Sequence, residues 1–147
     1  MQLLGSVLFG ADELVAEFVR VRIKHLRSPE HTFGKCAALG VVSGPDQVLI
    51  GGVVFTNYRG FDIEMSGAFD KPWWCRHDTL RTLFSYPFGQ LNCIRMTTVT
   101  GKKNKAARRI DEHMGFKLEG VARRGLDGVE DACIYSMLRH ECRWIRK

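Results

Sequence analysis

Hydrophobic positions along the chain follow two different repeats, and their alternation predicts a mixed α/β fold. Short apolar or alternating runs indicate strands over about 2–9, 35–43, 47–57, 61–68, 94–100, 116–124 and 130–138. An apolar spacing of three to four residues indicates helices over about 12–25, 75–90 and 104–114. The expected element order is therefore β-α-β-β-β-α-β-α-β-β.

This order predicts the topology of the sheet. Strand-helix-strand steps in the middle of the chain favour parallel neighbours joined by right-handed crossovers. Hairpins at both ends, the first turning at Ser43-Gly44-Pro45-Asp46, favour antiparallel flanks. Pro87 stands inside the second helix and is expected to kink or shorten it.

The third helix carries the clearest signals of its own limits. Asn104 is a good N-cap, and Gly115 can take the left-handed conformation that ends a helix. Between these two limits, Ala107, Ile110 and Met114 lay one apolar stripe along the helix. For the first helix, the expected inner face carries Leu14, Val15, Phe18, Val19, Arg22 and Ile23.

Composition is typical of one globular domain over residues 1–147. The chain is 45% hydrophobic and 26% charged, which is enough to build a core. No apolar run approaches the roughly 20 residues of a membrane helix, and the apolar start lacks a basic leader, so we expect no membrane association. The five cysteines include no Cys-x-x-Cys pair, which favours a reducing, cytoplasmic location.

The net charge of +6 has two possible explanations. A polyanionic partner, either nucleic acid or a phosphate-rich cofactor, is one explanation. A solvated basic surface is the other, and it is the default for a charge of this size. The basic residues nevertheless cluster around the start of the third helix, at Lys102, Lys103, Lys105, Arg108 and Arg109.

Metal and thiol chemistry are both disfavoured by the spacing of the residues that would perform them. His113, His140 and Cys142 do not have the spacing of metal ligands, so no metal is expected. Cys75 lies two residues before His77, but closeness in sequence is poor evidence for a nucleophile and its base. A structural thiol is therefore favoured.

The block from Asn104 to Gly120 contains more than a capped helix and its stop. A spaced set of its residues continues into the following strands: Asn104, Ala107, Gly115-Phe116, Glu119-Gly120, Arg123, Asp131 and Tyr135. On this set and on the element order, the chain resembles the GNAT superfamily of acyl-CoA-dependent N-acetyltransferases, in particular its ribosomal-protein and small-amine branch. Residues 49–57 and Tyr86-Pro87-Phe88 also look like acetyltransferase-like proteins of phage and prophage genomes.

The resemblance implies a mixed, mostly antiparallel twisted sheet flanked by helices, with acetyl-CoA as acyl donor and no metal. It implies that the strand from Ile63 to Ala68 splays from its neighbour and pairs with the pantetheine arm through Met65, Ser66 and Gly67. The start of the next helix, over 73–79, would hold the pyrophosphate with free N–H groups, near Arg76 and His77. By the same resemblance, Asn104 would hydrogen-bond the cofactor arm and Arg108 would lie near the phosphates.

The sequence departs from the GNAT pattern at two places. The glycine-rich phosphate loop is absent, because residues 71–78 contain no glycine and leave Arg76 or Lys71 to bind phosphate. Asp111 stands where many members have a tyrosine that protonates the leaving thiolate. An ionised Asp111 does not do this unless its pKa is strongly raised, although a thiol of pKa about 8.5 leaves tolerably as the anion.

The implied reaction is direct attack of an amine on the thioester in a ternary complex, which needs a base and an oxyanion donor. Glu64 is the first choice of base, with a solvated or salt-bridged carboxylate as an equal alternative, and Asp62 is the second choice. His77 is a further candidate base, but an exposed histidine without a catalytic role is the favoured interpretation.

Tyr135 is a candidate proton donor, but an aromatic side chain packed in the sheet is the favoured interpretation. Backbone N–H groups at 65–67 are the expected oxyanion donors.

The acceptor is expected to be an amine-bearing small molecule or protein. Two alternatives stay open at this point. One is a catalytically degenerate GNAT-fold binding module, and the other is a GNAT enzyme acting on nucleic acid or aminoacyl-tRNA. A homodimer is a further expectation, with the strand from Cys133 to Leu138 as its sheet edge.

Overall fold

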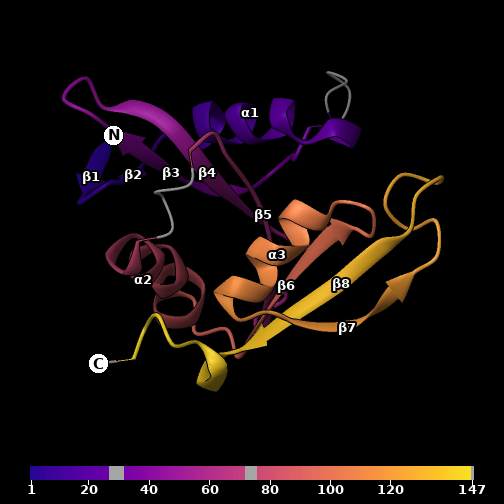
Figure 1. Cartoon of the computed structure of the whole chain (residues 1–147). Coiled ribbons are helices and arrows are strands. Elements are labelled where there is room, and N and C mark those ends of the chain that lie inside the picture. The colour runs from indigo at the N-terminus through magenta and orange to yellow at the C-terminus, as the bar shows by residue number, and fades with distance from the viewer. Residues whose placement is uncertain (27–31, 72–75, 147) are drawn as a thin grey trace.

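The computed structural model describes residues 1–26, 32–71 and 76–146, in which one sheet is flanked by helices (Figure 1). The sheet has eight strands, in the order β1-β2-β3-β4-β5-β6-β8-β7. Their bounds are β1 Gln2–Leu4, β2 Val7–Phe9, β3 Ala37–Ser43, β4 Val48–Thr56, β5 Asp62–Phe69, β6 Arg95–Gly101, β7 Lys117–Ala122 and β8 Ala132–Leu138. Among these strands β5 and β6 pair in parallel and the other neighbours are antiparallel, as the element order predicts.

Three α-helices accompany the sheet in the described residues: α1 Asp12–Arg22, α2 His77–Ser85 and α3 Lys105–Met114. The first helix is shorter than predicted, because a 3-10 turn at Lys24–Leu26 replaces its end. The second is also shorter, because it gives way at Ser85 to a π-type turn over Tyr86–Gln90 that contains Pro87. The single strand predicted over 2–9 is wrong, because Gly5, with φ 59°, turns it into the β1–β2 hairpin.

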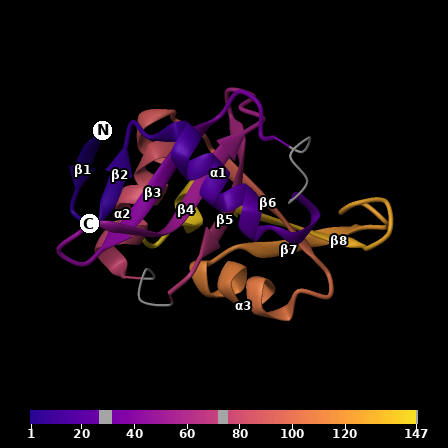
Figure 2. The same ribbon diagram turned by 90° about the horizontal axis from the view of Figure 1, so that it is seen from above.

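Two hydrophobic clusters occupy the two faces of the sheet. In one, Val15 and Val19 of α1 pack with Val54 of β4. The neighbours of Val54 along the strand, Val53 and Phe55, belong to the other cluster, together with apolar residues of α2 and α3. Because successive strand residues point to opposite faces, α1 covers one face of the sheet and α2 and α3 cover the other (Figure 1 and Figure 2).

The inner face of α1 is narrower than the sequence predicts. Val15 and Val19 are buried as expected, but Leu14 is 58% exposed and Arg20 is buried instead. Arg20 donates to Glu17 one turn earlier and to the Leu26 carbonyl, so its charge is paired within this segment.

Two adjacent glycines in β4 explain how α1 approaches the sheet so closely. A Cβ at Gly52 would lie 2.6 Å from Val15 and 3.2 Å from Val19, so only glycine lets the helix pack there without a shift. On the opposite face, a Cβ at Gly51 would lie 2.0 Å from the ring of Phe69. The pair therefore serves two different contacts, one on each side of the strand.

The sheet order corrects the expected dimer edge. The strand β8, which contains Cys133 and Leu138, lies between β6 and β7 and has both neighbours in place. The outer strand at this end is β7, so the prediction that Cys133 to Leu138 supply an open edge is wrong. None of the described helices has the length and apolar character needed to cross a bilayer.

Candidate active site

The parallel pair β5–β6 separates part-way along its length, and this split is the central feature of the site. The two strands pair from Asp62 and Arg95 to Glu64 and Thr97. Beyond this point β5 continues beside β4 as far as Phe69, while β6 continues beside β8. Among the residues that the structure describes, the facing edges, 65–69 and 98–101, therefore have no strand partner on the inner side. Backbone N–H and C=O groups along such edges are available to a bound chain.

A cavity of about 1580 Å³ opens at this split. Its walls come from both separated strands, from α2 and α3, from the segment after α1 and from the β7–β8 loop. The residues that matter for the chemistry below are Glu64, Met65, Ser66, Gly67, Lys71, Phe84, Thr100, Lys103, Asn104 and Asp111. The structure thus brings four of the predicted cofactor contacts and the predicted base to one cavity.

Glu64 lies on β5 at the last paired position before the split. It is half-buried, and burial raises the pKa of its carboxyl above the ordinary glutamate value. Two donors oppose this effect: Asn57 Nδ2 lies 3.3 Å and Thr56 Oγ1 3.5 Å from Glu64 Oε2. A carboxylate held by two neutral donors and raised in pKa is a suitable acceptor for a proton.

A second carboxyl reaches the cavity from α3. Asp111 is 7% exposed, and its Oδ2 accepts a hydrogen bond of 2.5 Å from Thr100 Oγ1 of β6. Burial raises its pKa from 3.8 to about 6, against the lowering effect of the Thr100 hydrogen bond. The sequence analysis placed Asp111 where many GNAT members have a tyrosine. Its burial and its hydrogen bond with Thr100 could not be predicted from the neighbouring residues in the sequence.

Asn104 begins α3 at the cavity wall, as predicted. Its Oδ1 accepts from the Ala107 backbone N–H at 3.2 Å, and Gly115, with φ 108°, ends the helix. Because the described hydrogen bond uses Oδ1, the amide Nδ2 remains to meet a ligand. The apolar stripe that the sequence predicts on α3 lines the cavity at Ala107 and Ile110, and Ile110 is 38% exposed.

Three solved structures of acetyltransferases are similar to this chain in fold. The ribosomal-protein-S5-alanine acetyltransferase of Vibrio fischeri matches with a TM-score of 0.66 at 16% identity, over 97% of this chain and 98% of that one. A GNAT-family acetyltransferase from Bacillus anthracis matches with a TM-score of 0.58 at 19% identity, over 71% of this chain and 67% of that one. The chain has the GNAT fold.

A third GNAT-fold neighbour is a mutant form of the spermidine/spermine N-acetyltransferase SpeG of Vibrio cholerae. It matches with a TM-score of 0.61 at 18% identity, over 71% of this chain and 68% of that one. No protein-family model matches the chain, and no curated protein matches it. At these identities the likeness establishes the GNAT fold, and the chemistry has to be argued from the residues of the cavity.

Tyr135 and Arg108, both predicted site residues, are not among the residues that line the cavity in this GNAT fold. Tyr135 is fully buried, and its hydroxyl donates to Glu112 at 2.8 Å and accepts from Arg108 Nε at 3.0 Å. Burial raises the pKa of the Tyr135 hydroxyl. Arg108 also donates to the Lys102 carbonyl. These bonds fix β8 against α3, which is a structural use of both side chains.

Tyr135→Phe is therefore expected to lower the free energy of unfolding by about 1–3 kcal/mol, because it removes a buried hydroxyl and with it the hydrogen bonds to Glu112 and Arg108. Chemical denaturation of the two proteins measures this loss. Turnover at a temperature where both are folded should change little. A fall in turnover without a loss of stability would instead restore the predicted role of Tyr135 as proton donor.

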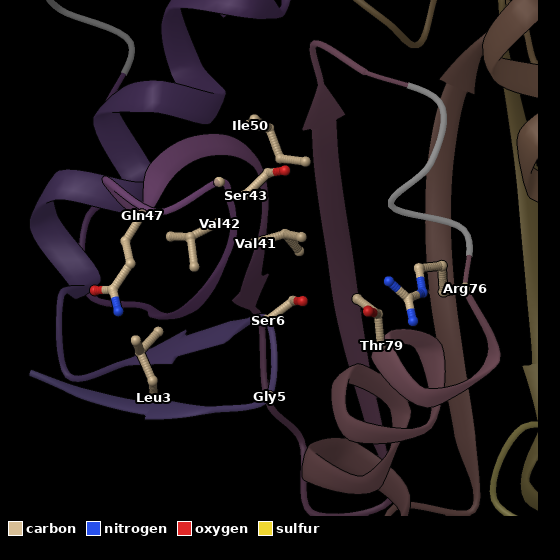
Figure 3. A pocket seen from close by; sticks show the side chains of 11 residues that line it. Leu3, Gly5, Ser6, Val41, Val42, Ser43, Gln47, Ile50, Arg76 and Thr79 are labelled. Carbon is tan, nitrogen blue, oxygen red and sulfur yellow. The ribbon is translucent and has the colours of Figure 1, made fainter.

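Arg76 and His77, at the start of α2, also lie away from the cavity wall. Arg76 borders a separate pocket of about 320 Å³, where Figure 3 shows it beside Thr79 and across from Val41 and Ser6. His77 packs edge-on against the ring of Trp144, with 5.6 Å between ring centroids. Cys75 and positions 73–75 of the expected pyrophosphate segment lie outside the described residues, so their role stays a prediction.

Asp62, the second candidate for the base, is paired with two arginine side chains. It is 6% exposed and lies 2.7 Å from Arg59 and 3.4 Å from Arg95, and it accepts from Thr97 Oγ1 at 3.0 Å. These partners hold it at the closed end of the split, where β5 and β6 are still paired. Within the described residues no group of three histidine, cysteine or acidic side chains is arranged to hold a metal ion.

Proposed function

We propose that the protein is an N-acetyltransferase that transfers the acetyl group of acetyl-CoA to an amine by direct attack in a ternary complex. The observation that carries this proposal is the split between β5 and β6, with its unpaired backbone edge and the cavity beside it. The acetyltransferase neighbours support the same chemistry at the level of the fold.

The residues at the split fit acetyl-CoA as the acyl donor. The unpaired backbone over 65–69 offers N–H and C=O groups to an extended, amide-bearing chain such as pantetheine. Because β5 and β6 run parallel, Lys71 and Lys103, just beyond their ends, lie at the same wide end of the split. We assign phosphate binding to these two lysines, in place of the missing glycine-rich loop. Asn104 Nδ2 is a further donor to the arm.

Two residues of this chain are assigned to the transfer itself. Bound acetyl-CoA supplies the thioester, which is the activated form of the acetyl group. Glu64 takes the proton that the acceptor ammonium must lose before its nitrogen can attack. The backbone N–H groups over 65–67, at the unpaired edge, are the donors for the oxygen that becomes negative during the attack.

Calorimetric titration with acetyl-CoA tests the proposal directly. Saturable binding is expected, and its absence up to millimolar acetyl-CoA would remove the enzymatic assignment. Asn104→Ala should weaken binding by up to about tenfold through the lost Nδ2 donor. The same change should lower the free energy of unfolding by about 1 kcal/mol, because the N-cap is lost.

A matched control separates the lost contact from the lost stability. Asp131 lies outside the cavity wall and accepts from the Arg124 backbone N–H at 2.8 Å, so Asp131→Ala removes a comparable hydrogen bond elsewhere. This variant should lose stability and keep the affinity for acetyl-CoA. Equal weakening by both variants would show that Asn104 acts through stability alone. Acceptors are then compared by thiol release with spermidine and with a peptide that begins with alanine.

A further inference from the structure

The pocket of about 320 Å³ beside the start of α2 is a second concave site, apart from the cavity at the split (Figure 3). Its walls come from the β1–β2 turn, from β3 with the turn that follows it, from β4 and from the start of α2. Among the described residues, the pocket and the cavity share no lining residue, although both border α2. Arg76 and Thr79 face the pocket, whereas Leu80 and Leu83 face the cavity.

A β-bulge in β3 shapes one wall of the pocket. The register between β3 and β4 shifts between Val41 and Val42. Successive residues of a regular strand point to opposite faces, but here Val41, Val42 and Ser43 all line the same pocket. The Val42 backbone N–H donates to the Ser6 carbonyl at 2.9 Å, which ties the β1–β2 turn to the bulge. Hydrogen-bonded backbone therefore fixes this wall.

Thr79 is the most deeply buried polar side chain of the pocket, at 3% exposed. Its backbone N–H donates to Asp78 Oδ1 at 3.0 Å, and no hydrogen bond within the described residues involves its hydroxyl. On the same helix, the hydroxyls of Thr82 and Ser85 donate to backbone carbonyls one turn earlier. A buried hydroxyl without a partner is unfavourable, so the Thr79 hydroxyl is free to meet a ligand in the pocket.

The charge at the pocket is positive. Figure 3 shows Thr79 between Arg76 and Ser6, with the Ser6 hydroxyl pointing toward the other two. Arg76 Nε lies 3.7 Å from Asp78 Oδ1, and the two terminal nitrogens of the guanidinium are outside this ion pair. None of the described residues that line the pocket is acidic. Arg76 is also the N-cap of α2, and the start of a helix favours negative charge.

We propose that this pocket binds the phosphate group of a small phosphate monoester, at a site separate from that of acetyl-CoA. The Arg76 guanidinium offers parallel N–H groups that match two phosphate oxygens. The Thr79 and Ser6 hydroxyls donate to the remaining oxygens. The organic part of the ester lies against Val41 and Ile50, which are both buried apolar side chains of the pocket. The site does not rest on the proposed acetyl transfer, in which two lysines at the other cavity bind the phosphates of coenzyme A.

Titration with inorganic phosphate and with phenyl phosphate, at constant ionic strength, tests the site. Saturable binding is expected, with a Kd of about 1 mM for inorganic phosphate. Phenyl phosphate should bind about tenfold more tightly, because its ring covers the apolar wall. Calorimetry measures both affinities, and the melting temperature should rise with the concentration of either probe. With the protein saturated with coenzyme A, both affinities should stay within about twofold, because the two sites are separate.

Two variants test the assigned contacts, each with a matched control on α2. Thr79→Val keeps the shape of the side chain and should lower the affinity for phosphate by about three- to tenfold. It should not lower the stability of the protein without phosphate, because the hydroxyl has no partner to lose. Arg76→Gln should lower the affinity by about tenfold. Thr82→Val, whose hydroxyl donates to the Asp78 carbonyl, and Arg81→Gln, at an exposed position, should leave the affinity unchanged.

Three results would overturn the proposal. One is the absence of saturable binding of either probe at concentrations far above millimolar. Another is competition by coenzyme A, which would show that the phosphate occupies the coenzyme's own site. The third is equal weakening by the control variants, which would assign binding to the general charge of α2. If coenzyme A does not bind at all, the acetyltransferase assignment fails, and the phosphate titrations still decide this proposal.

Discussion

Replacement of Glu64 by glutamine is expected to lower turnover by about 10²–10⁴-fold, the usual contribution of a positioned general base. Glutamine keeps the shape of the side chain and can still accept from Asn57 and Thr56, which lie 3.3 and 3.5 Å from Oε2. It cannot take a proton. Binding of acetyl-CoA should therefore stay within about twofold of the unchanged protein, because the contacts assigned to the donor are backbone groups and other side chains.

The pH profile gives the sign of the effect. A base must be ionised, so activity should rise with pH through the pKa of Glu64, which burial places above the ordinary value of 4.5. Glu64→Gln should lose this rising limb. Glu13→Gln, an identical change in the exposed first turn of α1, is the control and should keep both rate and profile. A Glu64→Gln protein with unchanged turnover would remove Glu64 from the mechanism.

Local signals explain why the limits of α3 and the general topology could be predicted. Asn104 acts through its own side chain, which accepts from the Ala107 backbone N–H, and Gly115 acts through its left-handed backbone, so the limits of α3 follow from the residues themselves. Pro87 likewise ends α2 early by a local effect. The strand order is less local, and the interior position of β8 was missed because both β7 and β8 read as a terminal hairpin.

The chemistry of the cavity depends on contacts between distant segments, which the sequence pattern does not reveal. Periodicity on α3 marks Ile110 as part of an apolar stripe, yet the buried neighbour is Asp111, because Thr100 of β6 supplies its partner. At Tyr135 the sequence favours a packed aromatic over a proton donor, and the positions of Arg108 and Glu112 show how its hydroxyl is engaged. Glu64 could be predicted to lie beside the split because the resemblance to GNAT proteins indicated the strand that splays.

Phe84→Ala is expected to lower the free energy of unfolding by about 3–5 kcal/mol, the largest stability effect that we predict. Phe84 lies on α2 and is 1% exposed. Its ring stacks on Phe88 with 6.3 Å between centroids and tilts against Phe116 at 6.1 Å. Phe116 directly follows the left-handed Gly115, so removal of the Phe84 ring loosens both helices at once.

Such a loss is a large part of the roughly 5–15 kcal/mol that stabilises a small domain, so the variant should melt well below the unchanged protein. Urea denaturation measures the difference. Phe61→Ala is the matched control: that ring is 46% exposed and contacts the Arg59 guanidinium, so its removal should cost about 1 kcal/mol or less. Because Phe84 also lines the cavity, its absence leaves space on the side facing the split. A loss of less than about 2 kcal/mol for Phe84→Ala would show that α2 moves in to fill that space, and that its position against the cavity is not fixed by the aromatic cluster.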